Sequence, residues 1–442
     1  MKAQTMLLGA IAAVLTACGG GSGGSVEPPA APLQPGSLRA APTLVATLDA
    51  ATLNQLIGTY GEQAGVGPAP CDVRVVAIDY HTPGTDGTLS NASGVVLLPS
   101  GADPACAGPR PLLGYGRGTE PRRNVTLASP ESPETLLLAA VFAARGYAVV
   151  ASDMLGHARS EHGFHPYLHV ASQGTSVLDS LRAARSVAGD LGVALSGQVL
   201  LAGYSQGGHS VASAQRAIEA LPGGEFQVVA ASYMAAPIDL VAAVRNPEAV
   251  QSYEVFATLL LTGYQRVYGN IYANPAEAFR SPYAEVIESL LPADDLASVF
   301  GSGKLPASAD PRENMVALMQ PAFLEAVQSD VNHPLVGAAA QNSFMDWVPA
   351  VPALVCYGLE DPMVPSALHS LPYVQGLAER GFSHVGALDV DPMVRQVFGE
   401  NGAVPTHPEA IAAYYARYHL EYLPPLCMLA TLGFFQAGAG TP

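Results

Sequence analysis

The stretch "QVLLAGYSQGGHS" at residues 198–210 decides the fold. Its apolar first half predicts a buried strand, and a helical pattern begins at Gln206. Between them stands Ser205, with Gly203 and Gly207 on either side. A serine flanked by glycines between a strand and a helix fits the pattern G-x-S-x-G. Glycine is required at both flanking positions because a Cβ there would clash with the adjacent strand or helix. Such a turn lifts the serine hydroxyl above the carboxyl edge of the sheet, so the stretch predicts that Ser205 is a nucleophile.

Strands and helices alternate along most of the chain on both sides of this turn. A pair of strands opens the pattern, and single strands then alternate with helices. We expect strands at 72–81, 92–100, 110–116, 147–153, 198–204, 226–236, 352–358 and 384–390, and helices at 133–146, 171–189, from 206, near 366–380 and at 408–423. This alternation predicts an α/β fold with a mostly parallel central sheet, helices on both faces and antiparallel strands only at the start.

The alternation stops between Asp239 and Pro349. Segments with a helical pattern, such as "PEAVQSYEVFATLLLTGYQRV", are separated there by Asn-Pro, Leu-Pro and a loop rich in Gly, Ser and Pro. Proline and glycine clusters of this kind separate short helices. We interpret residues 240–349, approximately, as a helical cap inserted between two strands of one domain that spans 43–442.

The N-terminal segment has the features of an export signal. "MKAQTMLLGAIAAVLTAC" combines a lysine with an apolar run too short to cross about 30 Å of hydrocarbon, so residues 1–17 are predicted to be a signal peptide. Its end, "LTAC", resembles the lipobox of bacterial lipoproteins, which implies lipidation of Cys18 and anchoring in a membrane. An ordinary secretory leader is the alternative. The same resemblance implies the outer membrane, because Gly19 rather than an acidic residue follows. Residues 18–42, rich in Gly and Ser and then in Pro, predict a tether.

Four further cysteines suggest two disulfides in a chain that is expected to be exported. Cys71 precedes the first strand of the opening pair and Cys106 follows the second, so antiparallel pairing of these strands would bring the two cysteines together. Cys356 and Cys427 would then form the other disulfide. Free buried thiols are the alternative, and the spacing of the cysteines fits no zinc site.

The sequence disfavours nucleic acids and metal ions as partners. Binding to nucleic acid depends on Lys and Arg that neutralise phosphates, whereas this chain has a net charge of −17. The stretch "GHARSEHGFHPYLH" at 156–169 gathers four histidines, but Pro166 breaks any helix that would align His165 with His169. No carboxylate stands at ligand spacing either. We interpret these residues as loop histidines and expect neither a metal nor another cofactor.

A serine nucleophile needs a base, and the base needs an acid that holds its tautomer. In chain order the nucleophile of such a turn is followed by the acid and then by the histidine. "VPALVCYGLEDPMVP" at 351–365 leads an apolar strand into a turn with Asp361, which we predict to be the acid. Glu360 and Asp239, which also follows a strand, are the alternatives.

Two histidines remain as candidates for the base. His384 stands at the start of a strand, and His407 in "AVPTHPEAIAAYY" stands immediately before the last helix. His209 lies on the helix that follows the nucleophile and is not expected to turn back over it. His419 is predicted to lie inside the last helix and is set aside for that reason.

An ester hydrolase also needs backbone N–H groups that face the negative charge developing on the carbonyl oxygen. The amide that follows the nucleophile, that of Gln206, is one candidate. The second amide is expected in "GYGRGTEP", the turn after the strand at 110–116. We predict Thr119 as this donor, with Gly118 as the next choice.

The chain resembles the α/β-hydrolases, and more narrowly the secretory lipases of the Candida lipase A type. The resemblance rests on "YGRGTEP", "GYAVVASDMLGHARSEHGFHPYLH", "SVLDSLRAARS", "GYSQGGHS", the helical insertion and "YGLEDPMVP", and it covers most of residues 72–423. It implies Ser205 as nucleophile, Asp361 as acid and His407, on the loop before the last helix, as base. Arg117 departs from the family pattern, because many relatives have histidine before the Gly-Thr pair.

We therefore expect a carboxylic-ester hydrolase, an esterase or lipase, that is anchored in the bacterial envelope and acts through an acyl-enzyme on a small-molecule or lipid ester. Apolar side chains of the cap are expected to line a pocket for short to medium acyl chains. Two alternatives remain. One is a non-catalytic binding protein of the envelope on a hydrolase scaffold, which a complete set of Ser, Asp and His argues against. The other is an acyltransferase or peptidase with the same triad.

Overall fold

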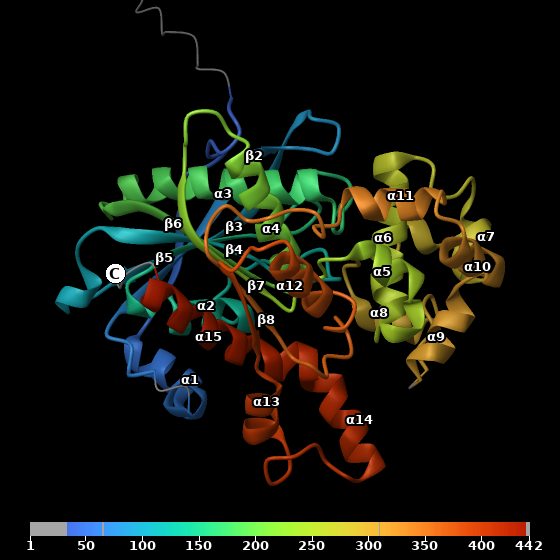
Figure 1. The fold of residues 1–442 in the computed structure, drawn as a ribbon. Helices are drawn as coiled ribbons and strands as arrows, with labels where there is room; N and C mark the ends of the chain where they lie inside the picture. The colour runs from blue at the N-terminus through green and yellow to red at the C-terminus, as the bar shows by residue number, and fades with distance from the viewer. Residues whose placement is uncertain (1–32, 64–65, 309, 439–442) are drawn as a thin grey trace, which may run out of the picture. The chain divides into compact units, whose positions relative to one another are not determined.

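One mixed sheet carries the fold in the computed structural model, which describes residues 33–63, 66–308 and 310–438 (Figure 1). The strand order is β1-β2-β3-β5-β4-β6-β7-β8-β9. The strands are β1 (Thr43–Leu48), β2 (Asp72–Pro83), β3 (Leu89–Ser100), β4 (Arg110–Gly116), β5 (Ala148–Ser152), β6 (Leu195–Tyr204), β7 (Gln227–Met234), β8 (Ala353–Tyr357) and β9 (Val385–Asp389). The pairs from β5 through β4 to β9 are parallel, whereas β1, β2, β3 and β5 pair antiparallel in that order.

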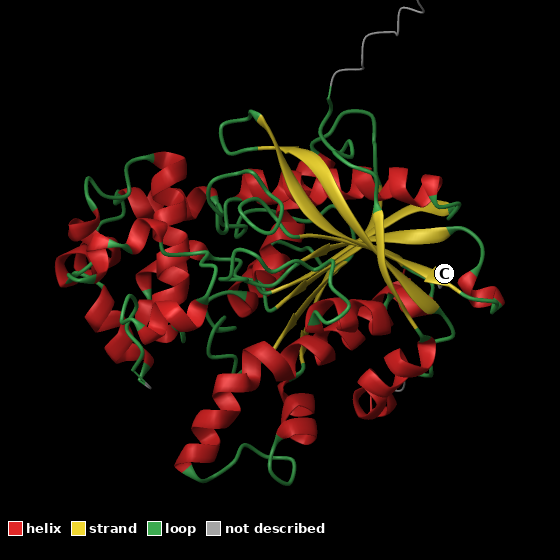
Figure 2. Ribbon diagram, turned by 180° about the vertical axis from the view of Figure 1, so that it is seen from behind, coloured by secondary structure: helices red, strands yellow, loops and turns green. Residues whose placement is uncertain are grey.

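Helices cover both faces of the sheet, as Figure 2 shows from behind. One face carries α1 (Ala50–Gln63), α2 (Pro133–Val141), α13 (Asp391–Phe398), α14 (Pro408–Arg417) and α15 (Leu423–Gly438), and the other carries α3 (Val170–Asp190), α4 (Gln206–Glu219) and α12 (Ser370–Glu379). Successive side chains of a strand point to opposite faces. In β4, Leu113 and Tyr115 accordingly join the core beneath α2 and α15, and Leu112 joins the core beneath α3 and α4.

The cap is a separate group of helices between β7 and β8, to the right of the sheet in Figure 1. Its helices are α5 (Leu240–Arg245), α6 (Tyr253–Tyr268), α7 (Pro275–Ala278), α8 (Leu296–Gly301), α9 (Pro311–Leu318), α10 (Pro321–Ser329) and α11 (Pro334–Gln341). Buried side chains such as Tyr264, Phe279 and Leu318 give it an apolar core of its own. The predicted α/β-hydrolase fold, with its mostly parallel sheet and inserted cap, is confirmed.

Both predicted disulfides are present. Cys71 is bonded to Cys106, and Cys356 is bonded to Cys427. The first joins the start of β2 to the segment after β3, because the antiparallel register pairs Asp72 with Ser100. The second ties β8 to α15 and so fixes the C-terminal helix against the sheet.

The N-terminal region differs in part from the expectation. Residues 34–42, the end of the predicted tether, lie against β2, where Leu38 forms a β-bridge with Tyr80. The predicted signal peptide, Cys18 and Gly19 lie outside the described residues. Within the described part of the chain, no helix is both long and apolar enough to cross a membrane.

Candidate active site

The turn around Ser205 is as tight as the sequence predicts. Ser205 immediately precedes α4 and adopts φ 56° and ψ −122°, a strained conformation for a residue with a side chain. A Cβ on Gly203 would lie 2.0 Å from the carbonyl oxygen of Gly207, and a Cβ on Gly207 would lie 1.8 Å from that of Gly116. Only glycine fits at these positions, and the turn holds the serine at the carboxyl end of β6.

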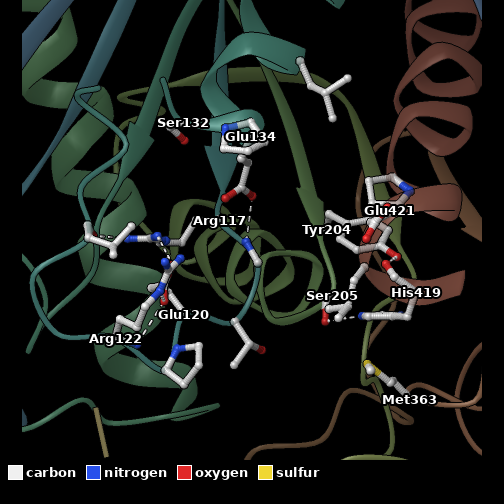
Figure 3. Close-up of a pocket in the computed structure, with 18 of the residues that line it drawn as sticks. Arg117, Glu120, Arg122, Ser132, Glu134, Tyr204, Ser205, Met363, His419 and Glu421 are labelled. Atoms are coloured by element: carbon white, nitrogen blue, oxygen red, sulfur yellow. Dashed lines mark hydrogen bonds and ion pairs between the residues drawn. The ribbon is translucent and has the colours of Figure 1, made fainter. Parts of the chain in front are cut away.

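Ser205 is hydrogen-bonded to a histidine and, through it, to a carboxylate. The Oγ of Ser205 lies 2.9 Å from Nε2 of His419 (Figure 3). Nδ1 of His419 lies 2.6 Å from Oδ2 of Asp361. A carboxylate only accepts hydrogen bonds, so Nδ1–H donates to Asp361 and Nε2 is left to accept from the serine hydroxyl. All three residues are buried. This arrangement can remove the serine proton and stabilise the imidazolium that results.

Asp361 occupies the position that the sequence predicts for the acid. It lies in the turn after β8, and its Oδ1 accepts hydrogen bonds from the amides of Met363 and Val364. The two alternatives have other partners. Glu360 accepts from Tyr415 and pairs with an arginine of α13, and Asp239 caps the N-terminus of α5.

The structure does not bring the predicted base, His407, to Ser205. His407 is exposed and is the residue immediately before α14, with no capping hydrogen bond from its side chain. The ten residues of α14 extend about 15 Å and separate it from the segment that carries His419. His384 does not contact Ser205 either, because it lies at the opposite edge of the sheet and contacts the carbonyl oxygen of Pro349.

His419 reaches the serine because the predicted last helix is interrupted. A π-helical turn, Tyr418–Tyr422, separates α14 from α15. Pro424 and Pro425 follow it; neither has an N–H, so the carbonyl groups one turn earlier lose their helical donors. The hydroxyl of Tyr204, the residue before the nucleophile, donates to the carbonyl oxygen of His419 at 2.5 Å. The Pro-Pro pair was the signal in the sequence that the helix is irregular next to this histidine.

Two backbone amides are candidates for binding a developing oxyanion. Gln206 is the first residue of α4, so its N–H has no acceptor within the helix. Gly118 is not available, because its N–H donates to Oε1 of Glu134 at 2.8 Å. Thr119, the next residue of the same loop, lines the cavity with Ser205 and remains the candidate for the second donor.

Arg117, the departure from the family pattern, is buried and ion-paired. It lies 3.4 Å from Asp153 and 3.6 Å from Glu120 and also donates to the carbonyl oxygen of Val125. Burial raises the pKa of the nearby Glu134, while the charge of Arg117 opposes that shift. Arg117 thus holds the loop that carries Thr119 in place, and its positive charge balances the negative charges of the carboxylates beside it.

Two cavities meet at Ser205. The larger, about 880 Å³, is partly polar and is lined by Arg117, Glu120, Glu134 and Glu421 among others (Figure 3). The smaller, about 80 Å³, lies beneath the cap and is lined mainly by apolar side chains of α5 and α6, with Met363 and Val364. In the described ranges no three His, Cys, Asp or Glu side chains come together as a possible metal site.

Comparisons with known proteins agree with this architecture. The ligand-bound structure of LipA, a rice cell wall degrading esterase from Xanthomonas oryzae, is 29% identical; the match covers 90% of this chain and 97% of LipA, with a TM-score of 0.77. Candida antarctica lipase A in its closed state is 16% identical over 81% of this chain and 76% of its own, with a TM-score of 0.55, a likeness of fold.

A family comparison goes further than these structural matches. No curated protein matches the sequence. The secretory lipase profile matches residues 127–384, more than half of the 442 residues, and this stretch includes the serine turn and the predicted acid. The chain therefore belongs to the secretory lipase family.

Proposed function

We propose that the chain is a serine carboxylic-ester hydrolase with Ser205 as nucleophile, His419 as base and Asp361 as the acid that orients it. The hydrogen bonds of 2.9 and 2.6 Å that join these three buried side chains carry the proposal. A fluorophosphonate probe, which reacts with activated serines, should label the wild-type chain at Ser205 and leave Ser205→Ala unlabelled.

The proposed reaction passes through an acyl-enzyme. Oγ of Ser205 attacks the ester carbonyl carbon while Nε2 of His419 takes the serine proton. The negative charge on the carbonyl oxygen is bound by the amides of Gln206 and Thr119. Collapse of this intermediate breaks the bond to the alcohol, which leaves with the proton from His419. Water, activated by the same imidazole, then attacks the acyl group and releases the acid and Ser205.

The alternative functions have less support. A binding protein with no catalytic role would not require a serine, an imidazole and a carboxylate in hydrogen-bonding order, nor a strained backbone at Ser205. A peptidase or acyltransferase could use the same three groups, so product analysis with water, alcohol and amine acceptors distinguishes these activities.

The two cavities suggest how an ester would be oriented. We assign the acyl chain to the small apolar cavity beneath α5 and α6, and the alcohol to the larger polar cavity. A space of about 80 Å³ fits a short acyl group without rearrangement, in line with short to medium acyl esters.

Filling the small cavity should shorten the acyl chains that are accepted. Ala243 lines this cavity and Ala242, its neighbour on α5, does not. Ala243→Leu should lower kcat/KM for p-nitrophenyl octanoate about tenfold or more and leave p-nitrophenyl acetate nearly unchanged, since each methylene in an apolar pocket contributes about 1–3 kcal/mol. Ala242→Leu is the control on the same helix. An equal loss for both esters would contradict the assignment of the acyl site.

We also propose that the chain is a lipid-anchored envelope protein, on the basis of the lipobox-like sequence that ends in Cys18. Metabolic labelling with palmitate in the producing bacterium should mark the mature protein, and Cys18→Ala should lose the label and the membrane association while it keeps esterase activity. A mature N-terminus at any residue other than 18, found by mass spectrometry, would refute the anchor and leave the proposed activity untouched.

A further inference from the structure

The loop between β5 and α3 carries four histidines that the proposed reaction does not use. Two of them, His157 and His165, are buried, with 2% and 4% of their surface exposed, and their ring centres lie 4.4 Å apart. Gly156 has a φ of +82°, and a Cβ there would lie 2.3 Å from the carbonyl oxygen of Phe164. The loop therefore closes tightly on itself and holds the two imidazoles together.

His157 and Tyr167 contact the loop that carries the candidate oxyanion donor Thr119. Nε2–H of His157 donates to the carbonyl oxygen of Glu120 at 2.7 Å. The hydroxyl of Tyr167 lies 3.0 Å from Oγ1 of Thr119. These contacts fix both ends of the peptide segment 119–120.

His165 contacts the side chain of Gln206, whose backbone amide is the other candidate donor. Its Nδ1–H donates to the carbonyl oxygen of Leu155 at 2.8 Å, which leaves Nε2 to accept from the side-chain amide of Gln206 at 2.7 Å. Burial lowers the pKa of His165 to about 4, so the imidazole is neutral at neutral pH and keeps this acceptor. His157 is protonated on Nε2 and His165 on Nδ1, and each ring directs its N–H at a carbonyl oxygen.

We propose that His157 and His165 are positioning residues that set the distance between the two amides of the oxyanion hole, one in the loop after β4 and one at the start of α4. The inference rests on the proposed function and adds to it a role for the histidine-rich loop. A shift of about 1 Å in a group that contacts the transition state can cost about 100-fold in rate. The two buried rings, which contact Glu120 and Gln206, are therefore expected to affect the rate.

Removing either contact should impair the transition state more than substrate binding. His165→Phe keeps a ring of similar size and loses both hydrogen bonds, and we expect kcat for p-nitrophenyl butyrate to fall about 10- to 100-fold with KM changed less than about twofold. His157→Leu should behave similarly, and His157→Gln, which restores an N–H donor at the same reach, should recover most of the rate. His162→Phe is the control, because it makes the same substitution in the same loop at a half-buried histidine.

A trifluoromethyl ketone separates positioning from loss of folded protein. Oγ of Ser205 adds to the ketone carbon, the serine proton passes to His419, and the resulting oxyanion occupies the hole. The Ki of this inhibitor should rise in His165→Phe by about the factor by which kcat falls. A smaller folded fraction would lower the apparent kcat and leave Ki unchanged.

Three results would overturn the proposal. They are wild-type kcat and Ki in His165→Phe, a fall in kcat with Ki unchanged, and an equal loss in His162→Phe. None of them would affect the proposed ester hydrolysis, whose failure would appear instead as full activity in Ser205→Ala and no inhibition of the wild-type chain by the ketone.

Discussion

Ser205→Ala should lower kcat for p-nitrophenyl butyrate by about 10⁴- to 10⁶-fold, because the members of a catalytic triad act as a unit and what remains is the contribution of the oxyanion hole and substrate binding. The fold should be unaffected. The serine is buried, alanine is smaller, and the backbone strain at φ 56° is the same for both residues. Circular dichroism and thermal unfolding should match the wild type.

Ser213→Ala is the matched control for this experiment. Ser213 is another buried serine of α4, and its hydroxyl donates to the carbonyl oxygen of His209 within the helix. Its loss should leave ester hydrolysis within about twofold of wild type, since a single internal hydrogen bond contributes only about 1 kcal/mol to folding. If Ser205→Ala kept more than about a tenth of the wild-type rate, the serine would not be the nucleophile.

The local sequence was sufficient to predict a structural feature where that feature depends on residues close together in the chain. The strand, the serine between glycines and the helix after it are contiguous, and steric exclusion of a Cβ at Gly203 and Gly207 determines the turn. Asp361 follows the same logic, because an apolar strand and a turn place it at the same edge of the sheet. The disulfide between Cys71 and Cys106 followed from the order of strands in an antiparallel pair, and the one between Cys356 and Cys427 followed by elimination.

Other features depend on distant side chains or lack a periodic signal. The choice between Gly118 and Thr119 depends on Glu134 of α2, whose carboxylate accepts a hydrogen bond from the N–H of Gly118. β1 was not predicted as a strand because most of its side chains are exposed, so the apolar alternation that marks a half-buried strand is weak. α1, directly after it, was missed as well.

The structure differs from the sequence-based expectation in which histidine lies beside Ser205. A helical pattern that runs without interruption through 408–423 predicts one helix, and a histidine within it would have its neighbours fixed by the helix. The structure instead places His419 in a π-helical turn, the kind of local irregularity that is frequent at functional sites. Tyr204, more than 200 residues earlier in the chain, holds the carbonyl group of that histidine, and no local pattern contains this contact.

His419→Ala and His407→Ala make the same substitution on either side of α14 and should differ by several orders of magnitude in activity. His419→Ala removes the acceptor of the serine proton and should lower kcat by about 10³- to 10⁶-fold. His407 is exposed and makes no capping hydrogen bond through its side chain, so its replacement should change stability by no more than about 0.5 kcal/mol and leave kcat near wild type.

Fluorophosphonate labelling of the same two variants tests the chemistry directly, since it reports the reactivity of Ser205 without a turnover step. His407→Ala should be labelled at the wild-type rate. His419→Ala should be labelled far more slowly, because the hydroxyl keeps its proton when Nε2 is absent. Inactivity of His407→Ala together with normal labelling and turnover of His419→Ala would contradict the hydrogen bonds of 2.9 and 2.6 Å as the catalytic arrangement and would require α14 to move its N-terminus to the serine.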